Sequence, residues 1–174
     1  MRFVVTLSVL WALAFPLFAA DPPPIPDEAH RRLEHMLGRW RVETKMLAPD
    51  GSVRGKLEWE NLAEWVIEDR VVLLTHQNPA RGIHSRALVF FNRDTEKFTI
   101  VDVSTEGDLW ILSGGLEGGF VLTSEPKRTA SGEMRVRFSH EDVDENRTLV
   151  VMEYSTDDGK SWIRGQEQTL TRVE

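Results

Sequence analysis

The amino-acid sequence predicts an all-β protein: a single antiparallel up-and-down barrel of about ten strands, with a short N-terminal helix closing one end. Apolar side chains recur at every second position from Trp40 to Arg172, which is the period of a half-buried strand. The links between these segments are too short for crossover helices, so successive strands should pair antiparallel. Ten such strands in an open sheet would leave two unpaired edges, which closure into a barrel removes. A two-sheet sandwich is the alternative architecture.

The first twenty residues are typical of a signal peptide. Arg2 supplies a positive charge, residues 3–18 form an apolar run, and Ala19 and Ala20 are the small residues at which a signal peptidase would cut. A retained N-terminal anchor is the alternative. We therefore expect an exported protein, periplasmic or extracellular, that is not inserted in a membrane once the segment is cleaved.

The composition limits the classes of partner. The chain of 174 residues carries 21 Lys and Arg against 28 Asp and Glu, a net charge of −7 that becomes −8 when the first twenty residues are removed. This balance disfavours nucleic acids and anionic membrane surfaces, because both are polyanions. The absence of cysteine means that packing and hydrogen bonds, rather than disulfides, must stabilise the exported fold.

Residues 21–26 are rich in proline and form a predicted spacer ahead of a barrel domain over residues 27–174. Asp27 is the expected N-cap of a helix of about three turns, which Gly38 ends. Its apolar stripe consists of Ala29, Leu33, Met36 and Leu37.

The second predicted strand shows the alternation most clearly. One face carries Leu57, Trp59, Ala63, Trp65 and Ile67, and the other carries Glu58, Glu60, Glu64 and Glu68. The ten expected strands lie near residues 40–46, 57–67, 70–77, 84–92, 98–103, 108–113, 120–124, 134–140, 147–155 and 162–172.

Two glycine-containing stretches have structural interpretations. Residues 113–119 are rich in glycine, but a strand rather than a helix follows and no lysine is present, so a turn is favoured over a phosphate cradle. Residues 155–162 fit the Asp-box pattern, in which Asp157 bonds backbone amides, Gly159 takes a positive φ and Trp162 packs beneath a hairpin.

A family resemblance follows from the residues after the helix. Met36-Leu37-Gly38-Arg39-Trp40 and the Asp-Gly-x-x-Trp hairpin near the end resemble the lipocalin-like (calycin) barrels, nearest to a bacterial group of lipocalin-like domains of unknown function. The resemblance implies that Arg172 of the final strand lies across the ring of Trp40, a contact worth about 1–2 kcal/mol.

The chain also departs from better-known barrels of this kind. It ends in a strand where true lipocalins have a helix, and residues 47–55 are too short for the lid helices of fatty-acid-binding barrels. Haem-binding barrels need a histidine in a C-terminal strand, and residues 147–172 contain none. No cofactor is therefore expected.

The interior of a ten-strand barrel is generally too wide for side chains alone to fill. The expected ligand-binding residues are the large or polar side chains on the inward parity: Trp59, Trp65, Trp110, Phe138, His140, Tyr154 and Gln166. His76 and His84 would face each other if residues 77 and 83 closed a hairpin, but two imidazoles are too few for a zinc site. The sequence predicts no metal site and no catalytic constellation. It favours a protein without enzymatic activity, and an enzyme stays an open alternative.

Three classes of function remain open. The first is a protein that binds a small apolar ligand in its interior, and the second is an enzyme that uses His140 or Tyr154 of the same cavity as acid or base. The third is a protein-interaction module whose barrel is filled and whose outer surface binds a partner. The oligomeric state is not predicted.

Overall fold

The computed structural model describes residues 23–78, 82–117, 119–129 and 132–173. The predicted signal peptide, residues 1–20, and the first two residues of the predicted spacer lie outside the described residues. Among the residues described, no helix has the length and apolar character needed to cross a membrane. In chain order the elements are α1 (Asp27–Met36), β1 (Gly38–Leu47), β2 (Val53–Ile67), β3 (Val71–Asn78), β4 (Ile83–Asn92), β5 (Lys97–Ser104), β6 (Leu109–Gly115), β7 (Phe120–Ser124), β8 (Lys127–Thr129), β9 (Gly132–Asp144), β10 (Arg147–Ser155) and β11 (Ile163–Val173).

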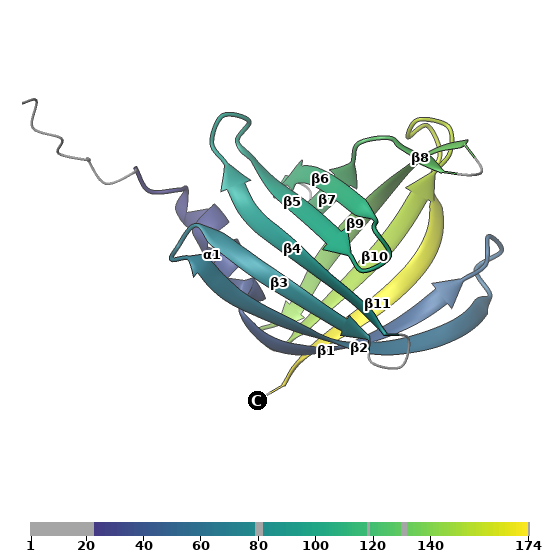
Figure 1. Ribbon diagram of the computed structural model, residues 1–174, viewed down its shortest axis with the longest axis horizontal. Coiled ribbons are helices and arrows are strands. Elements are labelled where there is room, and N and C mark those ends of the chain that lie inside the picture. Colours follow the sequence, from purple (N-terminus) through teal and green to yellow (C-terminus); the bar gives the residue numbers. More distant parts are fainter. Residues whose placement is uncertain (1–22, 79–81, 118, 130–131, 174) are drawn as a thin grey trace, which may run out of the picture.

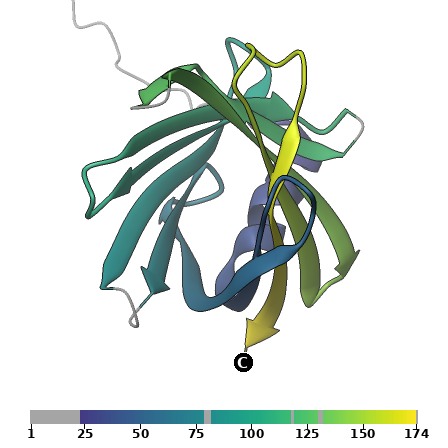
Figure 2. The same ribbon diagram turned by 90° about the vertical axis from the view of Figure 1, so that its right-hand side faces the viewer.

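The strands close into an antiparallel barrel, as the sequence predicts. Neighbours in sequence pair from β1 to β7, β7 pairs with β9, and β9, β10, β11 and β1 pair in turn to complete a ring of ten strands. The short β8 is an extra strand that pairs with the start of β9. Figure 1 shows α1 at one end of the barrel, and Figure 2, turned by 90° so that the other end faces the viewer, shows α1 behind the strands.

Helix α1 covers the barrel end with its apolar stripe. Ala29 and Leu33 are buried, and Met36 packs against the same core as they do. The prediction that Asp27 caps the helix is wrong: Pro26 is the cap residue, its carbonyl accepts the His30 amide at 3.0 Å, and Asp27 is the first helical residue. The acidic side chain of Asp27 still lies where the helix dipole favours it.

The junction between α1 and β1 confirms the predicted packing of Trp40 with Arg172. The Arg172 guanidinium carbon lies 4.2 Å from the centroid of the Trp40 ring, and the guanidinium donates to the carbonyls of His35 (3.0 Å) and Leu37. Gly38 has a φ of +102°, and a Cβ atom there would come within 2.8 Å of Arg172 Nη1. Glycine is therefore needed both for its backbone conformation and for its lack of a side chain.

The predicted faces of β2 are correct except at its C-terminal end. Glu58, Glu60 and Glu64 are exposed, and Ala63 is buried. Ile67, predicted to face inward, is 57% exposed. The pairing of β2 with β3 shifts register between Trp65 and Ile67, so the alternation on which that prediction rested is broken there.

The Asp-box segment forms the hairpin between β10 and β11, as expected. Asp157 Oδ1 accepts the Ser161 amide at 2.9 Å, and the hydrogen bonds from Ser161 and Ser155 lower the pKa of Asp157 to about 2. Gly159 has a φ of +84°. The Arg137 guanidinium carbon lies 4.3 Å from the Trp162 ring centroid, so the tryptophan has a structural role in the hairpin.

The glycine-rich stretch contains a close strand contact as well as a turn. Gly114 lies within β6, and a Cβ atom there would come within 1.8 Å of the Val121 carbonyl oxygen on β7. Only glycine lets these two strands approach so closely.

Candidate functional site

The barrel encloses a cavity of about 460 Å³, within the usual range for small-molecule pockets. Toward α1 its lining is largely apolar, but it also includes Arg32, His35, His140 and Thr148. The apolar residues there are Met36, Trp40, Leu74, Ile100, Leu112, Leu122 and Phe138. Toward the opposite end, where β3 turns into β4 and β5 into β6, the lining includes Ile83, Ser104, Glu106 and Asp108. The cavity therefore has a mainly apolar surface with polar side chains at both ends.

Between these parts, polar side chains of adjacent strands project inward. Asn61 on β2 lies directly opposite His76 on β3, which in turn lies opposite Ser85 on β4. Asp102 on β5 lies on the same inward face of its strand as Ile100 and Ser104. These residues form one polar wall, which we call the β2–β5 polar wall: Asn61, His76, Ser85 and Asp102.

The β2–β5 polar wall holds a neutral histidine. His76 Nδ1 lies 2.8 Å from Asn61 Oδ1, an acceptor, so Nδ1 carries the proton. Burial lowers the pKa of His76, and the negative charge of Asp102 opposes that shift without reversing it. In the neutral ring with Nδ1 protonated, Nε2 is an acceptor.

Three atoms of residues that line the cavity have unmet hydrogen-bonding capacity. Arg32 Nε, Trp59 Nε1 and Asp102 Oδ1 are buried, and none of the three has a hydrogen-bond partner among the described residues. Buried polar atoms in native proteins are paired in the great majority of cases, because an unmet group costs about 1–3 kcal/mol. Two donors and one acceptor of the lining residues are therefore unpaired beside the cavity.

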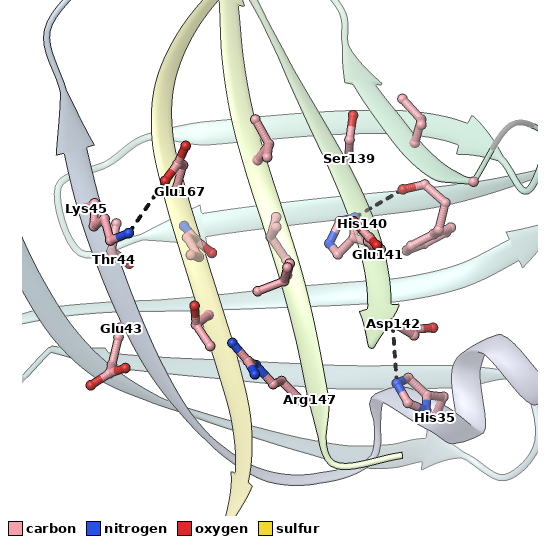
Figure 3. Close-up of a pocket in the computed structure, with 18 of the residues that line it drawn as sticks. His35, Glu43, Thr44, Lys45, Ser139, His140, Glu141, Asp142, Arg147 and Glu167 are labelled. Atoms are coloured by element: carbon pink, nitrogen blue, oxygen red, sulfur yellow. Dashed lines mark hydrogen bonds and ion pairs between the residues drawn. The ribbon is translucent and has the colours of Figure 1, made fainter. Parts of the chain in front are cut away.

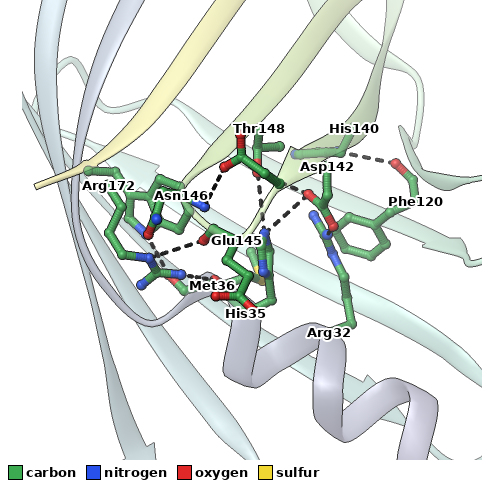
Figure 4. Close-up of polar contacts among 12 residues, drawn as sticks. Arg32, His35, Met36, Phe120, His140, Asp142, Glu145, Asn146, Thr148 and Arg172 are labelled. Atoms are coloured by element: carbon green, nitrogen blue, oxygen red, sulfur yellow. Dashed lines mark hydrogen bonds and ion pairs between the residues drawn. The ribbon is translucent and has the colours of Figure 1, made fainter.

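At the helix end, charged side chains join α1 to the barrel (Figure 4). Arg32, which is 8% exposed, donates to Asp142 of β9 and lies 4.3 Å from the Phe120 ring centroid. Asp142 also accepts the Thr148 hydroxyl at 2.9 Å and lies 3.3 Å from His35 Nε2. Burial lowers the pKa of both Arg32 and His35, with Asp142 opposing each shift. We call Arg32, His35, Asp142 and Thr148 the helix latch.

His140 lies between the helix latch and the cavity. Its Nδ1 donates to the Phe120 carbonyl at 3.2 Å, and its ring centroid lies 5.0 Å from that of Phe120. Burial, reinforced by the positive charge of Arg32, lowers the pKa of His140 to about 4. The imidazole is therefore neutral at physiological pH.

Five of the seven predicted binding residues line the cavity: Trp59, Trp110, Phe138, His140 and Gln166. Trp65 and Tyr154 are not part of the lining. Trp65 stacks on His30 of α1 with a centroid distance of 6.1 Å, and the Tyr154 ring packs over Gly165. Tyr154 lies opposite Val136, whereas His140 lies opposite Val150, so four residues of β10, about 13 Å, separate the two proposed acid–base groups.

The prediction omitted the polar wall itself. Each of its residues is spaced by an even number of positions from inward-facing apolar residues of its own strand. Asn61 shares a face with Trp59, and His76 shares a face with Val72 and Leu74. Asp102 shares a face with Phe98 and Ile100. A polar residue on an otherwise apolar face was the signal that could have identified each of them.

The structure does not pair His76 with His84. His76 lies opposite Ser85, and Gln77 lies opposite His84, because the hairpin closes at Asn78 and Ile83. His84 is on the outward face. Among the described residues, no group of three or more His, Cys, Asp or Glu side chains could hold a metal ion.

A second, larger depression of about 1380 Å³ runs along the wall formed by β1, β9, β10 and β11 (Figure 3). Its lining contains six basic and six acidic side chains, and several of these pair with one another: Lys45 with Glu167 at 3.7 Å, and Arg164 with Glu167 at 3.0 Å. Because Glu43, Lys45 and Arg164 are exposed, this surface has the character of a solvated exterior, and we take the interior cavity as the candidate site.

Solved structures that match this chain include the following two. The crystal structure of Rv2717c from M. tuberculosis matches with a TM-score of 0.54 and 14% identity, covering 87% of this chain and 100% of that one. The ywiB protein from Bacillus subtilis has 13% identity, a TM-score of 0.26, and coverage of 79% and 93%, respectively. The likeness to Rv2717c shows a shared barrel fold and no activity, and the weaker match carries no argument. No match to the sequence was found among curated proteins. The sequence model of the family described as "Protein of unknown function (DUF1579)" matches residues 25–172, and this chain therefore belongs to that family.

Proposed function

We propose that this protein is an exported, lipocalin-like binding protein that holds one small, mainly apolar molecule inside its barrel. The observation that carries the proposal is the cavity of about 460 Å³, whose accessible surface is mainly apolar and aromatic, with polar side chains placed around it. Such a combination is what small-molecule sites share: apolar surface for affinity and a few polar atoms for orientation.

The cavity argues against the filled-barrel alternative. A module that bound partners only through its outer surface would need no internal space, and an empty space costs stability because its lining loses packing contacts. The unpaired Trp59 Nε1 and Asp102 Oδ1 add a second cost that a bound molecule would remove. Of the two acid–base candidates, Tyr154 is not part of the cavity lining, which leaves His140 as the candidate there.

Binding is tested with 1-aminoanthracene, an apolar probe that is uncharged at neutral pH and fluoresces more strongly in an apolar site. Ser85→Phe places a large ring in the cavity, whereas Leu88→Phe places the same ring on the outer face of the same strand, where Leu88 is 41% exposed. We expect saturable, one-to-one binding to the wild type and to Leu88→Phe, and at least a tenfold weaker affinity for Ser85→Phe. Equal affinity for all three proteins, or no saturable binding to any, would refute the proposal.

Export is proposed from the N-terminal sequence alone. We expect the protein purified from its native host to have lost about the first twenty residues, as signal-peptide cleavage requires. Intact-mass measurement tests this, and a mature protein that retains Met1 through Ala20 would contradict it.

A further inference from the structure

We infer that the ligand of the interior cavity carries a protonated amine, which binds at Asp102 on the β2–β5 polar wall while the rest of the molecule extends toward α1. This inference rests on the proposed function and adds the chemical class of the ligand.

The first support is the chemistry of the polar atoms that face the cavity. An ionised carboxylate can only accept hydrogen bonds, and Asp102 Oδ1 is buried without a partner among the described residues. His76 has its Nδ1 proton directed to Asn61 Oδ1, which leaves Nε2 as a second acceptor. An ammonium group has three donors and no acceptor, so it complements two acceptors where a carboxylate ligand cannot.

The second support is the charge of the side chains around the cavity. Asp102, Glu106 and Asp108 contribute negative charge on the side away from α1, and Lys127 balances Asp108 alone through an ion pair. The positive charge at the helix end belongs to Arg32, which is paired with Asp142. Coulomb attraction therefore favours a cation over an anion in the part of the cavity near Asp102.

The third support is the aromatic surroundings of Asp102. Trp110 on β6 lies directly opposite Asp102 on β5, and Trp59 lies close to His76 with a centroid distance of 6.5 Å. Indole rings attract cations, but Lys127 Nζ already lies 4.3 Å from the Trp110 ring centroid, so the aromatic contribution to a ligand nitrogen comes from Trp59. A ligand nitrogen near Asp102 would thus have aromatic as well as anionic neighbours.

The remainder of the cavity determines the rest of the ligand. From Asp102 toward α1 the wall gains Leu74, Ile100, Leu112 and Leu122, which favour an apolar body in the ligand. Ala87, directly opposite Asp102 on β4, leaves space beside the carboxylate. The ligand class is therefore an amphipathic amine with a short apolar body.

The inference is tested by isothermal titration calorimetry with three probes that share one alkyl chain: n-octylamine, n-octanol and n-octanoate. We expect the wild type to bind octylamine at least about tenfold more tightly than octanol, and octanoate most weakly. Asp102→Asn keeps the shape of the side chain and should remove the preference for the amine while leaving octanol binding within about twofold. Glu60→Gln, the same charge change on the outward face of β2, should leave the ranking unchanged.

The outcomes separate this inference from the proposed function. If octanol or octanoate binds as tightly as octylamine, or if Asp102→Asn retains the preference, the amine assignment is overturned and the binding function stands. If none of the three probes binds, the amine assignment is overturned, and the result with 1-aminoanthracene then decides the binding function. Should Asp102→Asn fail to fold, the ranking on the wild type alone is decisive.

Discussion

Replacing Asp142 by Asn should weaken the attachment of α1 to the barrel. The change removes one negative charge from the helix latch and leaves the Arg32 guanidinium, 8% exposed, without an ionic partner. Breaking a fully buried ion pair costs about 3–5 kcal/mol, chiefly because an uncompensated charge remains buried. Asp142 is 37% exposed, and an asparagine oxygen can still accept a hydrogen bond. We therefore expect a loss of about 2 kcal/mol in the free energy of unfolding.

The assay is urea denaturation at pH 7, followed by far-UV circular dichroism, for a double-mutant cycle of Asp142→Asn with Arg32→Met. Methionine removes the buried cation, so Asp142→Asn should cost less than about 0.5 kcal/mol in the Arg32→Met background. The control is Asp69→Asn, which breaks the exposed contact of Asp69 with His30 of the same helix and should cost less than about 0.5 kcal/mol. The reasoning is refuted if Asp142→Asn is as mild as Asp69→Asn, or if the two substitutions of the cycle add independently.

Three further predictions concern stability. Gly114→Ala should cost about 3 kcal/mol or more by thermal or urea denaturation, because its Cβ would lie 1.8 Å from the Val121 carbonyl oxygen; a loss below about 1 kcal/mol would show that the strands can separate freely. Arg172→Met should cost about 2 kcal/mol by losing hydrogen bonds and the cation–π contact with Trp40, and an unchanged urea midpoint would contradict that role. The folded-state pKa of His140, about 4, lies below its ordinary value of about 6.5, so the unfolded chain binds the proton first and stability is lost as the pH falls from about 6.5 to about 4. His140→Gln should therefore reduce the loss of stability between pH 7 and pH 4.5 by roughly 2 kcal/mol, and an unchanged pH dependence would count against the buried, neutral imidazole.

Much of the architecture could be predicted from the sequence because its signals are local. Alternation with period two assigns each side chain to one face of its own strand, whatever that strand pairs with. For this reason the ten-strand barrel, the inward position of His140 and the Asp-box hairpin were predictable without coordinates. The contact of Arg172 with Trp40 was implied by the family resemblance and was confirmed.

The errors lie where alternation or local spacing stops being informative. Ile67 follows a register shift, and the closure of the β3–β4 hairpin at Asn78 and Ile83 sends His84 to the outside. Asp27 was taken as a cap because of its residue type, but the helix begins one residue earlier, after the Pro26 carbonyl. Each of these errors is a displacement of a strand face, a hairpin or a helix start by one residue along the chain. Residue types alone do not specify such a displacement.

The sequence by itself determined which side chains point into the barrel. The tertiary structure decided which of those side chains lie at the same height and line the cavity together. Trp65 and Tyr154 share the inward parity of Trp59 and His140, yet they pack at α1 and over Gly165 instead of lining the cavity. The polar wall of Asn61, His76, Ser85 and Asp102 comes from four strands spread over 42 positions of the chain. Their heights along the barrel axis depend on strand register and on closure of the ring, which are properties of the whole sheet rather than of any segment.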